Sequence, residues 1–508
     1  MFKRIIKDTS IVSLATLFSR FLGLIRDILI ANFFGTSSIL EAFLVAFRIP
    51  NLLRSALGEG FSDSVAVPVL SEYRKDKYEL FNISSHLLSI FIIVLSIVTA
   101  AGIIFSKYLV LCMAPGFLSD QETFLRAVSF TRITFLYIFL IGVSTCLTAI
   151  LYSLKKFFIP AFTPAFLNIA FILGIPFFFH SLKNNVLLLC VVAGGILQVI
   201  FPFMGVLREG FRFKFRLREA LSNSQIIRMF KLFVPRVWSS IVYQLSVLLD
   251  TILASFANIV GSGAICAIHY SSRFIQLPIA LIALPIFRVT IVDLSEYHKY
   301  GRMDEFKKLF VFSFQNLIFF IIPIAVVFMV FGRGILDVIL VRGGFKADSL
   351  EITASAFFFY SMGLLFFCAI KVLLGAFYSL KDTKTPAKTT AISLLVNAAF
   401  SILLMFPFKI AGVALGSSIA AMFNCFLLYY FLIKRIGPID WEDTLVQLLK
   451  IISLSIIAAF FAGIAWNLLF FNKYIKLMVS GFIFCAIFAF GACVFGFRQI
   501  IYIKRKFS

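Results

Sequence analysis

Five arginines lie inside long apolar stretches of the sequence, where their charge needs a partner. They are Arg20, Arg26, Arg48, Arg54 and Arg273. An arginine at the centre of a bilayer costs roughly 2.5–3.5 kcal/mol, so five of them facing lipid would be very unfavourable. A guanidinium stays charged and binds two phosphate oxygens at once. We therefore expect these side chains to face a polar cavity, and a diphosphate is the anion that suits them best.

Acidic and amide residues follow helical spacing near the arginines. Asp27 lies seven residues after Arg20, so the two share one face of a helix. On the next predicted helix, Glu41 and Arg48 form a stripe at spacing seven that Asn51 joins. The alternative role of the arginines is structural, in salt bridges with nearby acids. The candidate acids are Asp27, Glu41, Glu59 and Asp250.

Asp250 is a single carboxylate inside the apolar stretch 232–256. Carboxylates inside a membrane often mark an ion or proton pathway. The alternative is a salt bridge with Arg236 or Arg273, and the sequence leaves both interpretations open.

Composition indicates that the chain is a membrane protein. Of its 508 residues, 61% are hydrophobic and 14% are charged, and the mean hydropathy is +1.02. Soluble domains carry about 25% charged residues, so a soluble fold is excluded. The net charge of +23 lies mostly between the apolar stretches, which indicates contact with anionic membrane lipids and no nucleic acid. The eight cysteines form no CxxC and the four histidines are scattered, so we expect no zinc site.

The apolar stretches predict an all-α polytopic fold of about 14 transmembrane helices, because irregular backbone is not tolerated against lipid. We expect Pro278 and Pro285 to kink the longest stretch. The predicted spans are 10–34, 38–58, 84–105, 129–153, 157–180, 185–207, 232–256, 262–292, 309–332, 351–379, 386–408, 410–433, 446–470 and 474–497.

Lysine and arginine are divided unevenly between the two sets of connecting segments. The set that includes both termini carries 28, and the opposite set carries 9. The positive-inside rule therefore predicts both termini in the cytoplasm. The most basic segment, 208–231, interleaves Phe211, Phe213 and Phe215 with its bases. It is either an amphipathic segment on the cytoplasmic leaflet or an ordinary solvated loop.

Short motifs recur along the chain at a nearly constant offset. The pairs are 27–31 with 250–254, 70–73 with 294–297, 152–155 with 378–381, and Arg48 with Arg273. Each half then contains six helices, and a pseudo-twofold axis along the membrane normal should relate the halves. Duplication is typical of transporters whose site lies between the repeats. Such an axis would bring Arg48 and Arg273 toward one cavity.

Motifs for catalysis are absent from the sequence. It contains no GxxxxGK[ST] phosphate-binding loop, no HExxH and no grouping of serine, histidine and aspartate. We therefore expect a transporter that is not an enzyme and does not use ATP directly.

Several stretches resemble the MurJ (MviN) family of lipid II flippases. The most specific block runs from Glu41 to Tyr73 and includes the sequences FRIPN and VPVLSEY. Others are Ser19 to Asp27, Ile159 to Asn168, Ser272 to Pro278 and Asp382 to Pro386. The resemblance covers residues 10–435.

The resemblance implies the fold of the MOP transporter superfamily, with two six-helix lobes in a V and two further C-terminal helices. It also implies transport of lipid II, the undecaprenyl-diphosphate-linked peptidoglycan precursor, to the outer leaflet of the bacterial cytoplasmic (inner) membrane for cell-wall biogenesis and cell shape. The expected divisions are an N-lobe at 1–207, the basic linker at 208–231, a C-lobe at 232–435 and two helices at 436–508 that form a groove for lipid tails.

The resemblance also assigns residues. The arginines line the family's cavity, and Asp27 and Asn51 complete the substrate-binding set that we expect here. The members of that set are Arg20, Arg26, Asp27, Arg48, Asn51, Arg54 and Arg273. Some family members bind sodium as a coupling ion, and the corresponding positions are Asp250, Asn397, Val413 and Ser417. Two serines depart from the family pattern. Ser272 stands where an acidic residue usually precedes the arginine that corresponds to Arg273, and Ser401 stands where sodium-binding members carry an acidic residue.

Three other functions remain open at this point. The chain could flip another polyprenyl-diphosphate oligosaccharide, or export drugs like other members of the superfamily. It could also be a scaffold for cell-wall synthesis proteins that transports nothing. Cationic drugs need acidic sites, and a scaffold has no use for five costly arginines, so lipid II flipping is the leading interpretation.

Overall fold

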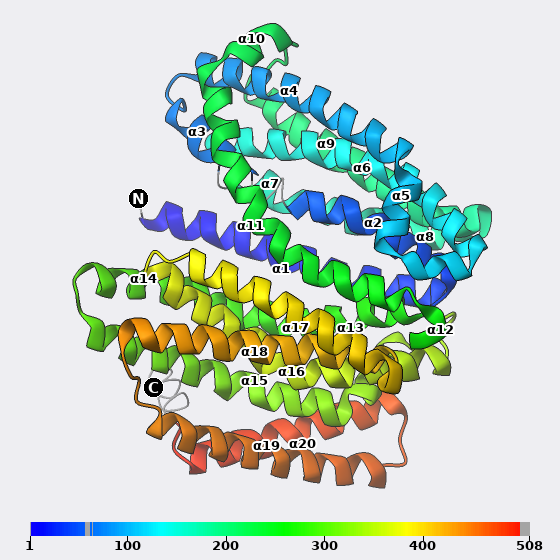
Figure 1. The fold of residues 1–508 in the computed structure, drawn as a ribbon, viewed down its shortest axis with the longest axis vertical. Coiled ribbons are helices and arrows are strands. Elements are labelled where there is room, and N and C mark those ends of the chain that lie inside the picture. The colour runs from blue at the N-terminus through cyan, green and yellow to red at the C-terminus, as the bar shows by residue number, and fades with distance from the viewer. Residues whose placement is uncertain (1, 56–60, 63–64, 498–508) are drawn as a thin grey trace. The chain divides into compact units, whose positions relative to one another are not determined.

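The computed structural model describes residues 2–55, 61–62 and 65–497, and within these ranges it omits the side chains of 2–11, 13, 55 and 234–244. Glu59 and the side chain of Arg236, both candidate salt-bridge partners, therefore lie outside the described residues. The described chain is helical and contains no strand. It forms two compact units, Met1–Ser255 and Phe256–Ser508 (Figure 1).

The first unit consists of long helices joined by short connections. A 3-10 turn at Pro115–Ser119 precedes α6, and another at Lys183–Asn185 precedes α9. The helices are α1 (Phe2–Phe34), α2 (Ser38–Ser55), α3 (Val67–Glu72), α4 (Lys77–Ile104), α5 (Ser106–Met113), α6 (Gln121–Ser153), α7 (Phe158–Phe162), α8 (Ala165–Leu182), α9 (Val186–Arg208), α10 (Leu217–Ser222) and α11 (Ser224–Ala254).

The second unit continues the same style. A π-helical segment, Ile279–Ala283, lies between Pro278 and Pro285 in the longest predicted stretch, and the kink expected from these prolines stays a prediction. The helices are α12 (Ala257–Val260), α13 (Ala264–Pro278), α14 (Leu284–Lys299), α15 (Met303–Leu340), α16 (Ala347–Ser379), α17 (Lys384–Phe408), α18 (Ile410–Ile436), α19 (Glu442–Leu468) and α20 (Lys473–Val494).

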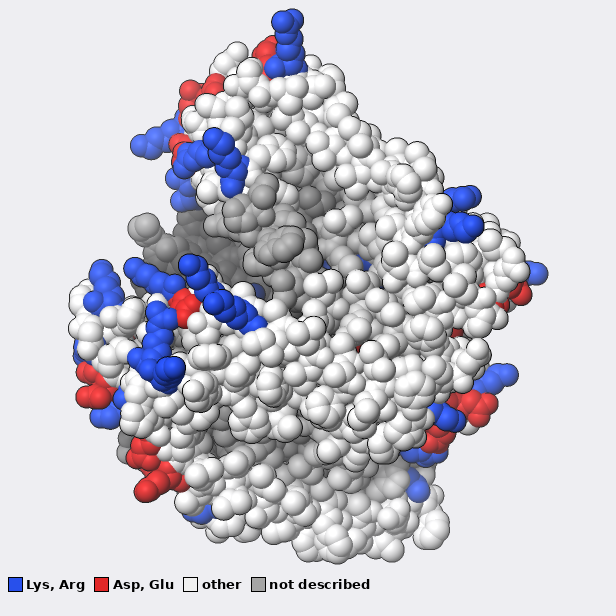
Figure 2. Space-filling view, in the orientation of Figure 1, with Lys and Arg blue, Asp and Glu red and all other residues white. Residues whose placement is uncertain are grey.

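Ten helical stretches among the described residues are long and apolar enough to cross a membrane. Large apolar side chains such as Leu395, Phe406 and Phe482 are exposed along these stretches. On the face shown in Figure 2, lysine and arginine gather near the ends of the helices, and the surface between the ends is almost free of charge. The chain is therefore a multi-pass membrane protein, as predicted. The count of 14 stays a prediction, because α1, α2 and α11 are not among the ten and because α8 and α9, predicted as two spans, form one of the ten stretches, Ala165–Arg208.

The internal repeat predicted from the motifs is visible in the bounds of the helices. One offset, which we call the repeat offset, separates both the starts and the ends of α6 and α16. The same offset separates the starts of α2 and α13, and those of α4 and α15. The connections repeat too, because Lys155 and Lys381 both have positive φ, and so do Lys183 and Lys409. Since non-glycine residues rarely adopt positive φ, two such pairs at the repeat offset confirm the duplication.

Each repeat contains an ion pair at the equivalent position, with the charges of the two partners exchanged. In the first unit, Lys156 Nζ lies 2.7 Å from Glu209 Oε1 and joins the α6–α7 connection to the end of α9. In the second unit, Asp382 pairs with Arg435 near the end of α18. Both partners are displaced by the repeat offset. The repeats therefore preserve this clasp between helix ends while reversing its polarity.

The helix α11 and the residue after it contact other helices and connections of the first unit. Arg228 near its start forms two hydrogen bonds with Glu72 at 2.9 and 3.0 Å, and Ser255 just past its end accepts one from the backbone N–H of Gly116 at 3.0 Å. The boundary between the compact units therefore follows α11, whereas the predicted C-lobe begins at 232, near the start of this helix. The lobe assignment itself stays a prediction.

Candidate substrate and ion sites

Arg26 on α1 is held in a buried polar cluster. Its Nε and Nη2 donate to Asp27 Oδ1 at 3.0 and 2.7 Å, and its Nη1 donates to Asn168 Oδ1 on α8 at 3.1 Å. Its Cζ lies 5.8 Å from the centre of the Phe171 ring, also on α8. The side chains of Arg26 and Asp27 are only 12% and 8% exposed. Two of the predicted residues therefore lie together, and the charge of Arg26 is matched by the acid that the sequence offered as its alternative partner.

Arg48 on α2 contacts the last turn of α11. Its Nε and Nη2 donate to Thr251 Oγ1 at 3.1 and 2.7 Å, and that hydroxyl donates to the carbonyl of Val247. Thr251 is buried and directly follows Asp250 in the sequence. The structure thus brings a predicted arginine next to the turn that carries the predicted intramembrane acid.

Aromatic rings in contact connect the surroundings of these two arginines. Phe171, beside Arg26, has its ring centre 6.1 Å from that of Phe43 on α2. Phe43 stacks on Phe47 at 5.6 Å, and Phe47 immediately precedes Arg48. Aromatic contacts thus run from Arg26 on α1 through Phe171 on α8 to Phe43 and Phe47 on α2.

The other predicted substrate residues are placed differently. Arg54 Nε donates to Asn51 Oδ1 at 3.0 Å near the end of α2, and Arg54 is exposed. Arg20 is exposed on α1. Arg273 lies on α13 in the second unit and is partly buried. The convergence of Arg48 and Arg273 on one cavity stays a prediction.

Three of the four predicted sodium ligands lie together in the second unit. Ser401 Oγ on α17 lies 2.9 Å from Asn397 Oδ1 and 3.3 Å from the carbonyl oxygen of Val413 on α18. Ser417 Oγ lies 3.3 Å from the same Asn397 oxygen. These three ligands and Ser401 are all buried. The arrangement is a cluster of neutral oxygens, which is the ligand type that hard cations prefer.

Close approach of α17 and α18 produces this neutral cluster. A Cβ added to Gly416 would meet Ser401 Oγ at 2.2 Å and the Ser401 backbone nitrogen at 2.6 Å. One added to Gly412 would meet the carbonyl oxygen of Leu404 at 2.0 Å. Small residues four apart let membrane helices pack backbone to backbone, so these glycines bring the polar groups of the two helices into contact. Asp250, the fourth predicted ligand, belongs to α11 in the first unit and is partly buried.

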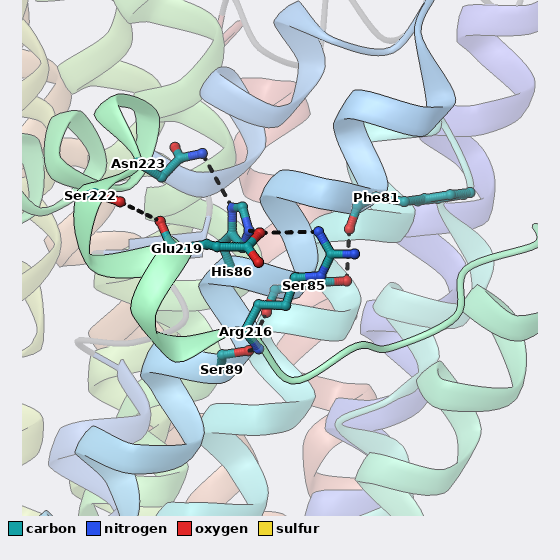
Figure 3. A network of polar contacts seen from close by, with 8 residues as sticks. All are labelled: Phe81, Ser85, His86, Ser89, Arg216, Glu219, Ser222 and Asn223. Carbon is teal, nitrogen blue, oxygen red and sulfur yellow. Dashed lines mark hydrogen bonds and ion pairs between the residues drawn. The ribbon is translucent and has the colours of Figure 1, made fainter.

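The basic linker packs on α4 through a polar network (Figure 3). Asn223 Nδ2 donates to Nδ1 of the buried His86 at 3.2 Å, and Glu219 Oε2 lies 3.5 Å from His86 Nε2. The backbone N–H of Arg216 donates to Ser89 Oγ at 3.1 Å. The predicted linker is therefore a folded element, with Phe211 buried and Phe213 and Phe215 exposed.

Sequence reasoning missed Thr251 and the role of Asn168. Asn168 lay in a stretch that resembles the family, but its partner Arg26 is 142 positions away. Thr251 is 203 positions from Arg48. The one signal available for Thr251 was its place directly after Asp250.

Comparisons with known proteins agree with this architecture. A family model described as "Lipid II flippase MurJ" matches residues 30–486. The "Probable lipid II flippase MurJ" of Buchnera aphidicola subsp. Acyrthosiphon pisum is 32% identical over 509 residues, which cover 98% of each chain. The "Lipid II flippase MurJ" of Burkholderia cenocepacia is 33% identical over 434 residues, covering 84% of this chain and 83% of that protein.

Solved structures give the same result. A lipid II flippase MurJ in an inward closed conformation superposes with a TM-score of 0.81 at 26% identity, over 96% of this chain and 99% of that one. An inward-facing multidrug resistance MATE transporter of the MOP superfamily reaches 0.68 at 14% identity, over 82% and 94%, a likeness of fold alone. This protein therefore belongs to the lipid II flippase MurJ family, whose members are transporters and not enzymes.

Proposed function

We propose that this chain flips lipid II from the inner to the outer leaflet of the bacterial cytoplasmic membrane by alternating access. The observation that carries the proposal is the pair of arginines, Arg26 and Arg48, that membrane helices hold in polar surroundings. Together with the family match, they supply cationic forks where an anionic headgroup has to cross.

The geometry of Arg26 suits a diphosphate. A guanidinium has five N–H donors, and the contacts with Asp27 and Asn168 use three of them. Asp27 offsets the cost of burying the charge when no substrate is present. An entering diphosphate can then be bound by a guanidinium that is already oriented, which reduces the entropy lost on binding.

The likeness to drug exporters does not support drug export. The MATE structure is 14% identical and supports the fold alone, and buried arginines repel cationic drugs. Other polyprenyl-diphosphate carriers share the anionic group, so the sugar preference of the chain rests on the family match.

Two finer points belong to the same proposal. Both termini lie in the cytoplasm, because the 28-to-9 distribution of lysine and arginine favours that orientation. Anionic lipids contact the linker, where exposed Phe213 and Phe215 alternate with Arg212 and Lys214. Cell-wall synthesis proteins stay predicted partners.

Sodium is proposed as a coupling ion, held by Asn397, Ser417 and the Val413 carbonyl, with Asp250 as the charged ligand. The neutral oxygens fit a hard cation in type. Because Ser401 supplies a hydroxyl and no second carboxylate, we expect modest sodium affinity. The membrane potential, about 2.3 kcal/mol per charge per 100 mV, would then supply part of the drive.

Complementation of a strain depleted of its lipid II flippase tests the proposal. Arg48→Ala and Arg273→Ala should each abolish growth at normal membrane levels, and Lys should rescue poorly because it lacks the bidentate fork. Arg333→Ala is the matched control, since Arg333 is exposed and pairs with the exposed Glu351. Normal growth of both Ala variants would refute the arginine-clamp proposal.

A further inference from the structure

The carboxamide of Asn168 has only one orientation that its neighbours allow. Its Oδ1 faces Arg26 Nη1 at 3.1 Å, and a guanidinium can only donate. Its Nδ2 faces the backbone carbonyl oxygen of Ser19 at 2.9 Å, and a carbonyl can only accept. Reversing the amide would place donor against donor and acceptor against acceptor. The side chain is therefore fixed from both ends, and it is 7% exposed.

These two hydrogen bonds connect α8 to α1 at points seven residues apart. Seven residues of an α-helix span about 10 Å, or two turns. Gly23 lies between the two points, and a Cβ added there would meet Asn168 Nδ2 at 3.7 Å. Asn168 thus reaches both the backbone of α1 and the charged tip of Arg26, across the one residue of that face that has no side chain.

Asp27 alone leaves the direction of the guanidinium open. Both bonds to Asp27 end on the same oxygen, Oδ1, so the group can still pivot about that atom. The Asn168 contact engages the other nitrogen, Nη1, and Phe171, one turn further along α8, covers one face of the group. The contacts with Asp27 Oδ1, the Phe171 ring and Asn168 Oδ1 together fix the plane and direction of the guanidinium, and the Asn168 contact is the one that engages Nη1.

We propose that Asn168 is a positioning residue that fixes the plane and direction of the Arg26 guanidinium for binding of the lipid diphosphate. The inference rests on the proposed function, because it assigns Arg26 to that ligand. Its content is separate, since it says that the affinity for the diphosphate depends on a neutral amide that acts through Arg26.

The test compares lipid II binding by the full-length protein in detergent micelles with its thermal stability. Asn168→Leu and Asn168→Ala remove both hydrogen bonds, and Asn168→Gln keeps the amide. Gln198→Leu is the matched control, because Gln198 is a buried amide of the same unit that bonds Tyr137 Oη and the Thr163 carbonyl. Each Asn168 variant is also made in an Arg26→Lys background.

We expect Asn168→Leu and Asn168→Ala to weaken lipid II binding about tenfold, the loss of one charge-assisted hydrogen bond. Asn168→Gln should recover most of the affinity. In the Arg26→Lys background the same changes should have less than a twofold effect, since no fork remains to be oriented. Gln198→Leu should lower the melting temperature and leave the affinity unchanged.

Wild-type affinity in folded Asn168→Leu or Asn168→Ala would overturn the inference while the proposed function stands. So would an equal loss with and without Arg26→Lys, because this would show a structural effect that does not pass through Arg26. If Asn168→Leu is not recovered as a folded protein, Asn168→Ala decides. A wild-type protein that retains no lipid II would overturn the proposed function and the inference with it.

Discussion

Asn168 and Asn397 lie on equivalent helices of the two repeats, and each is a buried amide beside a predicted site. At the repeat offset, the start of α7 matches the start of α17, and the end of α8 matches its end. Asn168 accepts a hydrogen bond from the cationic Arg26, which in turn contacts Asp27. Asn397 accepts from two neutral hydroxyls, Ser401 and Ser417. One duplicated framework therefore places an ion pair beside the amide in the first unit and serine hydroxyls beside the amide in the second.

The comparison teaches how a single fold can prepare two different ligand sites. A fixed guanidinium attracts an anion, whereas carbonyl and hydroxyl oxygens are the ligands that hard cations take. Arg26 corresponds to Leu249 at the offset that aligns Asp27 with Asp250. In the first unit the guanidinium of Arg26 contacts the adjacent Asp27. In the second motif the residue before Asp250 is the uncharged Leu249.

Arg26→Leu should have the largest effect on stability, because it places at position 26 the leucine that stands at the corresponding position 249 of the repeated motif. Removing one partner of a buried ion pair costs roughly 3–5 kcal/mol, and the Arg26–Asp27 pair is almost fully buried. Thermal unfolding in detergent should show the loss, and Arg26→Leu combined with Asp27→Asn should recover part of it. A double variant less stable than the single one would show that Asp27 is not held by Arg26.

Gly416→Ala should break the neutral cluster from the other side. The added Cβ would lie 2.2 Å from Ser401 Oγ and 2.7 Å from Ser401 Cα, and overpacking of this kind costs roughly 1–3 kcal/mol. Gly463→Ala is the control, because a Cβ at Gly463 meets no atom within 4 Å in the described structure. Equal melting temperatures for the two variants would contradict the close packing of α17 and α18.

Ser401→Asp should sharpen the cation preference of the second cluster. A carboxylate there would face two acceptors, Asn397 Oδ1 and the Val413 carbonyl, and a cation between them would relieve the repulsion. We expect the melting temperature of Ser401→Asp to rise with sodium at constant ionic strength, by an amount that corresponds to about tenfold tighter sodium binding than in wild type. A variant insensitive to sodium would argue against a cation site.

Exchanging the charges of the first clasp should have the smallest effect. Lys156→Asp and Glu209→Arg should each lower stability by about 0.5–1 kcal/mol, and the double variant should recover part of it, since the second repeat works with that polarity. Recovery stays partial because Lys77 Nζ lies 3.6 Å from Glu209 Oε2 and would repel an arginine at position 209. In the second repeat the residue that corresponds to Lys77 is the uncharged Met303. Additive losses in the double variant would show that the clasp is not an interacting pair.

The clasp also predicts a pH dependence. The hydrogen bond from Lys156 holds the pKa of Glu209 below its ordinary value. A depressed carboxyl pKa contributes stability that is present above the unfolded value, about 4.3, and is lost as the pH falls through the folded value. The difference in melting temperature between wild type and Glu209→Gln should therefore shrink at acidic pH. A constant difference would mean that the glutamate charge contributes nothing.

Residue type and spacing were enough to predict part of this organisation. The membrane fold follows from apolar length and the repeat from matched motifs, and Asp27 was among the acids expected to pair with the arginines. The contacts of Asn168 and Thr251 could not be predicted, because they join positions far apart in the sequence. The exchanged clasp could not be predicted from identical motifs either, because the equivalent residues Lys156 and Asp382 are opposite in charge.

The central claim is that buried arginines of this chain bind the diphosphate of lipid II, and native mass spectrometry of the purified protein measures it most directly. Lipid II added to wild type should remain bound as a resolved adduct. Arg26→Ala and Arg48→Ala should each reduce that adduct about tenfold or more, as expected for the loss of a charge-assisted contact, and Arg333→Ala should not. Equal retention of lipid II by the wild type and both arginine variants would contradict the account.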